Sequence, residues 1–177
     1  IGTLDGKQIY EKDYSIKFAD NLSQELKRLG FKVVMTRTTD YDVPRADRVA
    51  TVHRSDADLL FSVHHNAASS SASGGMTLYP SEKNSPSSQA AFSESKDIAD
   101  LLKGAYTSSG MTYRGAYRDR DMAGGSLYML RSSDTRSILT EVGFISNTKD
   151  ARKIVNPAFQ KELPRQMAKQ VYNFFYK

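Results

Sequence analysis

Cysteine is absent from this 177-residue sequence, and its absence excludes disulfides, zinc ribbons and thiol nucleophiles. A chain without cysteine fits a reducing cytosol and equally fits exported bacterial proteins that do without disulfides. Long apolar runs are also absent, since none approaches the roughly 18 residues that a membrane-spanning helix needs. Residues 1–5 lack the charged region and apolar stretch of a secretory leader, so an exported form would already have lost its signal.

Internal repeats, linkers and blocks of like charge are missing as well. The length suits one hydrophobic core and is too short for two comfortable domains, so we expect a single domain over residues 1–177. Lysine and arginine outnumber the acidic residues, which gives a net charge of +5 and a pI of about 9.3. This charge favours a polyanionic environment such as nucleic acid, anionic lipid or acidic cell-wall polymer, and it also fits an ordinary solvated basic surface.

Helical and strand patterns alternate along the chain. Apolar residues recur at helical spacing over 14–29 and again over 159–174, although Pro164 should kink or restart the second helix. Polar loops follow Asn66 and run through Pro86. The alternation predicts an α/β fold of three α/β/α layers with a mostly parallel central sheet of about five or six strands. Two further helices are predicted over 44–54 and 89–102, and short strands over 31–36, 59–66, 76–79, 126–131 and 137–142.

Two of the predicted strands end in groups that a buried strand does not need. The apolar run from Leu59 delivers His64 and His65 to its carboxyl end, and the run from Ser137 delivers Glu141. Burying a carboxylate or an unpaired imidazole is costly unless a metal, a hydrogen bond or a charge compensates. Because ligands gather beyond the carboxyl ends of the strands in open α/β sheets, His64 and Glu141 predict a shared site.

Other candidate residues can also be explained by a structural role, without any part in a functional site. Glu11 lies just before the first amphipathic helix, where the helix dipole favours a carboxylate even if it binds nothing. His65 should point to the opposite face of its strand from His64. His53, inside a predicted helix, reads as a surface or helix-end residue, and Arg48 reads as a partner in a structural ion pair.

The order of these residue types resembles a known family. Glu11-Lys12-Asp13 opens a helix, Ser62-Val63-His64-x-Asn66 ends a strand, and the run from Thr140 to Asn147 follows far downstream. In this order they resemble the zinc-dependent N-acetylmuramoyl-L-alanine amidases of the type 3 family, which cleave bacterial peptidoglycan. Further matching pieces are residues 33–37, 39–40, 48, 57–59, 114–115 and 130–131.

The resemblance implies a zinc site and a reaction. Glu11 and His64 would be two protein ligands of one Zn²⁺, and Glu141 the acid/base residue beside the metal-bound water. Zinc accepts imidazole nitrogen and carboxylate oxygen, and a catalytic site keeps three protein ligands and one open position. The reaction implied is hydrolysis of the amide bond between N-acetylmuramic acid and L-alanine. Candidate substrate contacts are Asn66, Arg114 and Arg131. Asn66 could instead be a turn residue, and the two arginines could instead be solvated surface residues.

One part of the family's pattern does not occur in the sequence. These amidases normally begin with a strand that ends in an Asp-Pro-Gly-His-Gly-like turn, whose histidine is the remaining zinc ligand, and no Gly-His sequence occurs here. We therefore expect the third ligand upstream of Ile1. In the resembling fold this strand lies inside the sheet, so residues 1–177 alone should be unstable unless something else fills its place.

Two alternatives to the enzyme follow from the same residues. A catalytically inactive relative that binds peptidoglycan would explain the incomplete ligand set. A basic nucleic-acid-binding α/β domain would need a clustered stripe of Lys and Arg with aromatic side chains, which the sequence lacks, so no nucleic-acid partner is expected. The resemblance implies a secreted or wall-associated bacterial monomer, which the basic surface could hold near anionic wall polymers. An autolysin, a cell-separation enzyme and a phage endolysin would share this domain.

Overall fold

The structure is a computed structural model that describes residues 1–81, 89–122 and 124–177. The predicted loop through Pro86 lies outside the described residues over 82–88. A hairpin of two short antiparallel strands, β1 (Gly2–Leu4) and β2 (Lys7–Ile9), comes first. The elements after it are α1 (Glu11–Arg28), α2 (Arg45–Ser55), β3 (Leu59–Asn66), β4 (Gly75–Tyr79), α3 (Gln89–Ser108), β5 (Tyr113–Arg118), the 3-10 turn η2 (Asp119–Asp121), α4 (Tyr128–Ser132), β6 (Arg136–Phe144), α5 (Thr148–Ile154) and α6 (Pro157–Tyr176).

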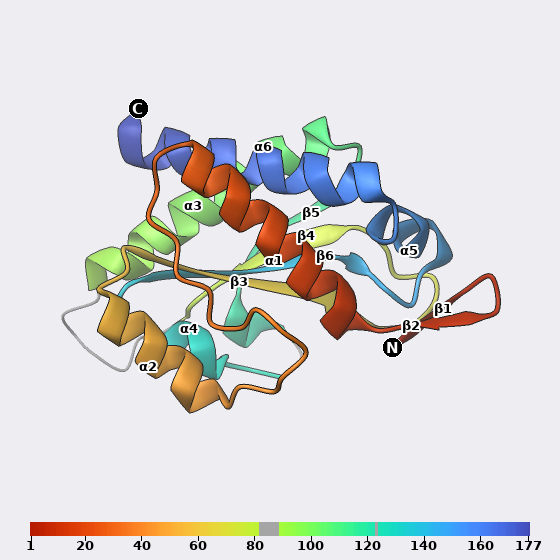
Figure 1. Ribbon diagram of the computed structural model, residues 1–177, viewed down its shortest axis with the longest axis horizontal. Helices are drawn as coiled ribbons and strands as arrows, with labels where there is room; N and C mark the ends of the chain where they lie inside the picture. Colours follow the sequence, from red (N-terminus) through yellow and green to blue (C-terminus); the bar gives the residue numbers. More distant parts are fainter. Residues whose placement is uncertain (82–88, 123) are drawn as a thin grey trace.

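The central sheet of the described chain has four strands in the order β3, β6, β4, β5. β3 pairs parallel with β6, and β4 pairs parallel with β5, while β4 and β6 run antiparallel. Helices α1, α3 and α6 cover one face of the sheet, and α2 and α4 lie on the other (Figure 1). The predicted three-layer α/β/α fold with a mostly parallel sheet is therefore confirmed, although four strands stand where about five or six were expected.

The main core fills the space between the sheet and the layer of α1, α3 and α6. Phe18 of α1, Leu102 of α3 and Leu163 of α6 are fully buried there against Ile138 of β6. A smaller cluster lies on the other face of the sheet and consists of Met76, Leu78, Leu130, Leu139 and Phe144. Both faces of β6 are thus covered, which is what its nearly uninterrupted apolar sequence requires.

Two predicted strands are not strands. Residues 31–36 have no regular secondary structure, because no described strand lies beside them to pair with their backbone. Residues 126–131 instead lead into α4, where Leu130 N donates to Leu127 O and the Leu130 side chain is fully buried. An apolar run this short fits either element. β5 was not predicted, because its polar sequence Tyr-Arg-Gly-Ala-Tyr-Arg lacks an apolar strand pattern.

Helix α6 runs through Pro164 in one piece, so of the predicted kink or restart at this proline the restart is wrong. Proline has no N–H, so the carbonyl of Gln160, four residues earlier, loses its usual helical donor. Asn21 of α1 supplies a replacement, since its Nδ2 donates to Gln160 O at 2.8 Å. The neighbouring helix thus compensates for the proline. No helix in the described ranges is both long enough and apolar enough to cross a membrane.

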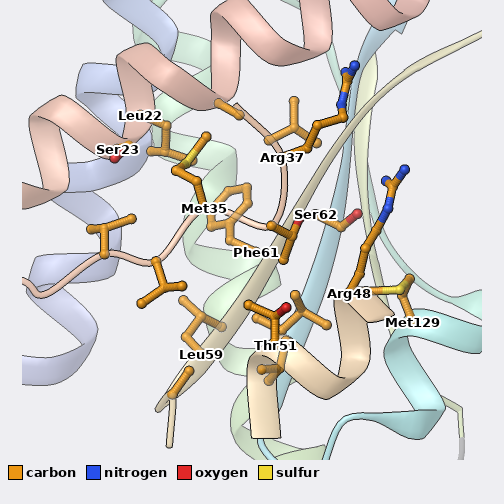
Figure 2. A pocket seen from close by; sticks show the side chains of 18 of the residues that line it. Leu22, Ser23, Met35, Arg37, Arg48, Thr51, Leu59, Phe61, Ser62 and Met129 are labelled. Carbon is orange, nitrogen blue, oxygen red and sulfur yellow. The ribbon is translucent and has the colours of Figure 1, made fainter. Parts of the chain in front are cut away.

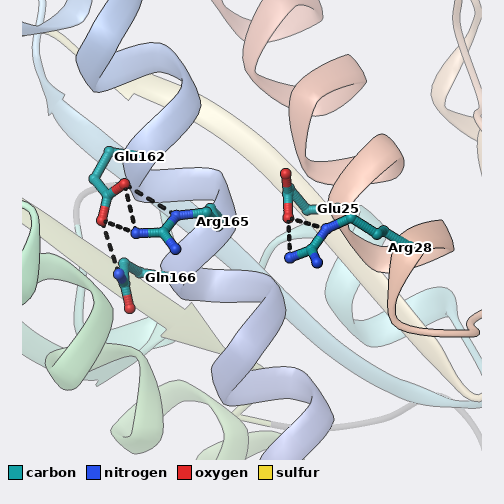
Figure 3. Close-up of polar contacts among 5 residues, drawn as sticks. All are labelled: Glu25, Arg28, Glu162, Arg165 and Gln166. Carbon is teal, nitrogen blue, oxygen red and sulfur yellow. Dashed lines mark hydrogen bonds and ion pairs between the residues drawn. The ribbon is translucent and has the colours of Figure 1, made fainter.

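Charged side chains one turn apart lie along the outer sides of α1 and α6 (Figure 3). Arg28 Nη2 donates to Glu25 at 2.9 Å, and Arg165 Nη2 donates to Glu162 at 2.8 Å. Hydrogen bonds from Arg165 and Gln166 hold the pKa of Glu162 below its usual range. Exposed pairs of this kind stabilise a protein only weakly, so the buried apolar faces hold the two helices together.

Candidate functional site

The carboxyl ends of β3 and β6 bring two of the predicted site residues side by side. His64 and Glu141 are partners in the parallel register of these strands, and neighbouring strands lie about 4.8 Å apart. Residues opposite each other in register point to the same face of a sheet. The imidazole and the carboxyl group therefore face the same side, at the edge where ligands of open α/β sheets bind.

Glu11, the first residue of α1, joins this pair from a third element. Its Oε1 accepts a hydrogen bond from His64 Nδ1 at 2.8 Å and another from the backbone N–H of His65 at 3.2 Å. The His64 and Glu11 side chains are 40% and 39% exposed. A ligand arriving from solvent can therefore reach both, and the backbone bond fixes the carboxylate against the end of β3.

Burial and neighbouring charges set the protonation of the three groups. Burial raises the pKa of Glu141 to about 7, with the charge of His64 opposing and that of Glu11 adding to the rise. Burial alone would lower the pKa of His64, but the hydrogen bond to Glu11 and the two carboxylate charges raise it overall. For Glu11, hydrogen bonds from His64 and His65 outweigh burial and lower its pKa. Near neutral pH, Glu141 can take up and release a proton while Glu11 stays ionised.

The donor set fits part of a zinc site. Glu11 and His64 offer a carboxylate oxygen and an imidazole nitrogen, both ordinary zinc ligands. Glu141 Oε2 is buried and has no hydrogen-bond partner in the described part of the chain. Across residues 1–81, 89–122 and 124–177, no three His, Cys, Asp or Glu side chains form a group that could hold a metal ion. A catalytic zinc site with three protein ligands would need one more donor than the described residues bring together here.

The other two histidines point away from this group. His65 is 2% exposed, faces α1 with its Nδ1 3.0 Å from Ser15 Oγ, and packs edge-on against the Phe18 ring. Burial lowers the pKa of His65 to about 4, so it is neutral near pH 7. His53 lies on α2 with its Nε2 3.6 Å from Asp134, on the surface. Both placements agree with the sequence-based expectation.

Two of the predicted substrate contacts lie at the same edge of the sheet and are already bonded to their surroundings. Asn66 Oδ1 accepts a hydrogen bond from Ala67 N at 2.8 Å, as a turn residue would. Arg114, at the start of β5, donates from Nη1 to Ser73 O at 3.1 Å, and its guanidinium lies over the Phe144 ring. Arg114 is therefore held beside the serine-rich loop, two strands away from Glu141.

Two other arginines are held by their own segments. Arg131 lies over the Tyr128 ring and donates to Ser126 O, both within its own segment, and none of its described contacts reaches Glu11, His64 or Glu141. Arg48 donates to Val43 O at 2.7 Å and pairs with Asp42, as a structural role predicts. Its charge nevertheless acts on His64, where it opposes the rise of the pKa.

Tyr106 supports Glu141 from behind and was not predicted. Its ring is fully buried, and its hydroxyl donates to the backbone oxygen of Glu141 at 3.0 Å and contacts the Thr140 hydroxyl. Gly75 leaves room for the ring, because a Cβ at this position would lie 2.1 Å from it. In the sequence, the only signals for this contact are a tyrosine within a predicted helix and a glycine before a predicted strand. Ordinary packing explains each of them equally well, so neither singled out Tyr106.

Two further polar side chains fix the loop at the rim of the site. Asn147 Nδ2 donates to Ser70 O at 2.6 Å. Asp150 Oδ2 accepts hydrogen bonds from Gly74 N at 2.7 Å and from Phe144 N at 2.9 Å. The serine-rich loop after β3 is therefore tied to the end of β6, as its predicted place at the rim requires.

Comparisons with known proteins agree with the motif order. Residues 1–173 match a protein-family model described as N-acetylmuramoyl-L-alanine amidase. The chain is 31% identical over 160 residues to the probable cell wall amidase LytH of Staphylococcus aureus, and 26% identical over 204 residues to the N-acetylmuramoyl-L-alanine amidase AmiC of Neisseria meningitidis. These matches cover 90% and 98% of this chain but only 46% and 49% of the relatives, so the chain spans about half their length.

Solved structures share the fold. The N-acetylmuramoyl-L-alanine amidase of Clostridium difficile 630 has a TM-score of 0.84 and 26% sequence identity, and the match covers 98% of this chain and 89% of that one. The catalytic domain of CwlV, an amidase from Bacillus (Paenibacillus) polymyxa, has a TM-score of 0.80 at 24% identity, covering 95% and 86% of the two chains. The described arrangement of helices and sheet is thus that of these proteins.

Proposed function

This chain belongs to the N-acetylmuramoyl-L-alanine amidase family, and we propose that it hydrolyses the amide bond between N-acetylmuramic acid and L-alanine in bacterial peptidoglycan. The observation that carries the proposal is the meeting of Glu11, His64 and Glu141 at one edge of the sheet. These three residue types, in this order along the chain, suit amide hydrolysis assisted by a metal and a carboxylate.

In this proposal Glu11 and His64 are protein ligands of one Zn²⁺, beside a third ligand that the described residues do not bring to this pair. The hydrogen bond between His64 Nδ1 and Glu11 Oε1 holds the two proposed ligands next to each other. When bound, zinc polarises the amide carbonyl and makes a water molecule more acidic. The backbone bond from His65 N orients the Glu11 carboxylate toward that position.

Glu141 acts as the acid/base residue. It takes a proton from the attacking water, whose oxygen forms a bond to the carbonyl carbon of the lactyl group. As the C–N bond breaks, Glu141 gives the proton to the nitrogen of the departing alanine. A pKa of about 7 suits both steps. Tyr106 keeps the strand under Glu141 in place through the backbone oxygen of that residue.

The substrate is expected to lie along the same edge of the sheet, in the bacterial cell wall. Of the proposed substrate contacts, Arg114 is held beside the serine-rich loop that follows β3. Asn66 and Arg131 contact residues close to them in the sequence. The net charge of +5 suits a secreted monomer that stays near anionic wall polymers. The printed name of the staphylococcal relative, a probable cell wall amidase, supports this location.

The test uses purified peptidoglycan and the intact protein. We expect the release of soluble stem peptides that carry a new free L-alanine amine, loss of this activity with a chelator, and recovery with Zn²⁺. Glu141→Gln should abolish turnover and leave the zinc content, measured by elemental analysis, nearly unchanged. Asp13→Asn is the matched control, because it removes another carboxylate near the site without touching the three residues.

Two results would contradict the proposal. Retained turnover in Glu141→Gln would remove that residue from the mechanism. Protein that pellets with cell walls, contains zinc and still releases nothing would favour the alternative, an inactive peptidoglycan binder.

A further inference from the structure

An exposed tyrosine lies at the rim of the proposed site. Tyr41 belongs to the segment that joins α1 to α2, and it is 70% exposed. The pocket that reaches Glu11 and His64 is lined by Tyr41 as well. Within the described ranges, no hydrogen bond, ion pair or ring contact involves the Tyr41 side chain. Its ring is therefore open to a molecule that approaches the site.

The residue before Tyr41 is tied to the first turn of α1. Asp40 pairs with Lys12, and Asp40 Oδ1 lies 3.7 Å from Arg37 Nη1. Lys12 directly follows Glu11 in α1, and Arg37 Nη2 donates to Lys12 O at 3.1 Å. These bonds hold the segment against the turn that carries Glu11.

The residue after Tyr41 is held by α2. Arg48 Nη2 lies 3.4 Å from Asp42 Oδ1, and Arg48 Nε donates to Val43 O at 2.7 Å. Exposed ion pairs are weak one by one, but each of the two arginines also bonds to a backbone oxygen. With both neighbours bonded to the body of the protein, the Tyr41 ring between them is held out to solvent.

The two arginines also place the segment beside the end of β3. Figure 2 shows the guanidinium groups of Arg37 and Arg48 pointing the same way, away from Leu59, where β3 begins. His64 lies toward the other end of this strand, and the charge of Arg48 acts on His64. Tyr41 is thus fixed at the β3 side of the proposed site.

The surroundings of Tyr41 suit a sugar ring. The face of an aromatic ring carries partial negative charge, so the C–H groups on one face of a sugar can pack against it. The side chains of Asp40 and Asp42 are 67% and 97% exposed, whereas their arginine partners are only 17% and 29% exposed. Carboxylates accept hydrogen bonds from sugar hydroxyls, and they repel the carboxylates of a stem peptide.

We propose that Tyr41 is a substrate-binding residue whose ring stacks on a saccharide of the glycan strand. The glycan then crosses the site on the side of β3, and the stem peptide extends toward β5, where Arg114 is a proposed contact. Because β3 and β5 are the two edges of the described central sheet, glycan and peptide lie on opposite sides of Glu141. This inference rests on the proposed function for the identity of the ligand.

The first test measures binding at position 41 without any turnover. Residues 1–177 contain no tryptophan, so the difference in emission between Tyr41→Trp and the natural intact protein isolates the new indole. The ligand is a β-1,4-linked tetramer of N-acetylglucosamine, which keeps the sugar backbone of the glycan and lacks the peptide. We expect a saturable change in emission with this tetramer and none with free stem peptide. Tyr176→Trp, at a position that is 61% exposed at the end of α6, is the matched control and should respond to neither.

The second test measures kinetics on soluble peptidoglycan fragments. Tyr41→Ala should raise KM by about threefold to tenfold and leave kcat nearly unchanged, because stacking on an aromatic ring binds substrate and transition state alike. Tyr41→Phe keeps the ring and should keep the natural KM. An unchanged KM in Tyr41→Ala would overturn the proposal.

The two tests separate this inference from the proposed function. An intact protein that cleaves peptidoglycan, but whose indole at position 41 does not respond to the tetramer, would overturn the glycan contact and leave the amidase reaction standing. A response to the stem peptide instead of the tetramer would overturn it in favour of a peptide contact. A saturable response to the tetramer without any cleavage would support the glycan contact and contradict the proposed reaction.

Discussion

At the scale of single residues, a carboxyl group that titrates near neutral pH is the basis of the proposed chemistry. Burial places the pKa of Glu141 at about 7, against an ordinary value of 4.5. At a pH between these two values, Glu141 is protonated in the folded protein and ionised in the unfolded chain. Glu141 therefore favours folding at low pH, and this contribution disappears as the pH rises through about 7.

This linkage predicts the effect of Glu141→Gln on metal-free protein. The free energy of unfolding of the variant, relative to the natural chain, should rise by roughly 2 to 3 kcal/mol between about pH 5 and about pH 8, because glutamine cannot ionise. Urea unfolding in the presence of a chelator measures it. His65, whose low pKa acts in the opposite direction, is common to both proteins. Equal pH profiles for the two proteins would show that Glu141 has an ordinary pKa.

Glu11 and His64 are predicted to act together on zinc. Glu11→Ala and His64→Ala should each weaken zinc affinity by more than about tenfold, since each removes one of few ligands. Asp13→Ala removes a carboxylate from the same first turn of α1 and should have little effect. Titration with a competing chelator measures the three affinities, and an unchanged value for either ligand variant would exclude that residue from the site.

The sequence pointed to some of these residues and not to others for a physical reason. Glu141 and His64 stand out because ionisable groups are costly in apolar strands, and Glu11 stands out through the motif order. Tyr106 acts through the backbone oxygen of Glu141. Every residue type has a backbone oxygen, so the sequence at position 141 does not indicate that this atom accepts a hydrogen bond. Only the folded structure shows the pairing.

At the scale of elements, helix α6 illustrates how a neighbour can override a local rule. Asn21→Ala should lower the free energy of unfolding by about 1 to 2 kcal/mol, because the carbonyl of Gln160 is left without a donor. In a Pro164→Ala background the helix regains its own N–H, so the same change should cost clearly less. A double-mutant cycle by urea unfolding measures the coupling.

The matched surface control for this cycle is Arg165→Ala, which breaks the exposed pair with Glu162 on the same helix (Figure 3). It should change the free energy of unfolding by no more than about 1 kcal/mol. If Asn21→Ala costs the same with and without Pro164, its amide does not compensate for the proline.

The sequence predicts correctly those elements that bury an apolar face, and it fails for elements that depend on a neighbouring strand or have a short apolar run. The long helices and the strands β3, β4 and β6 follow from periodicity, because each buries a face or a whole run in the core. Residues 31–36 carry a strand sequence and form no strand, since pairing depends on a neighbour that the described chain does not place there. The predicted strand over 126–131 is helical from residue 128 onward, because its apolar run is too short for the pattern to separate helix from strand.

At the scale of the whole molecule, the three layers place α1, β3 and β6 so that their ends converge on one edge. The net charge of +5 does not determine this fold, but it attracts the protein to anionic polymers. We predict that association with isolated cell walls weakens strongly as ionic strength rises from about 0.01 M to about 0.15 M, because the screening length falls from about 30 to about 8 Å. Wall binding that salt leaves unchanged would argue against an electrostatic role.

The most direct test of a zinc site beside Glu141 is a zinc-edge anomalous difference map from crystals of the intact protein. We expect one strong peak at about 2.0 to 2.2 Å from a carboxylate oxygen of Glu11 and from a ring nitrogen of His64, with Glu141 beside it and not bonded to it. Protein that carries stoichiometric zinc but shows no peak at these two side chains would contradict the assignment.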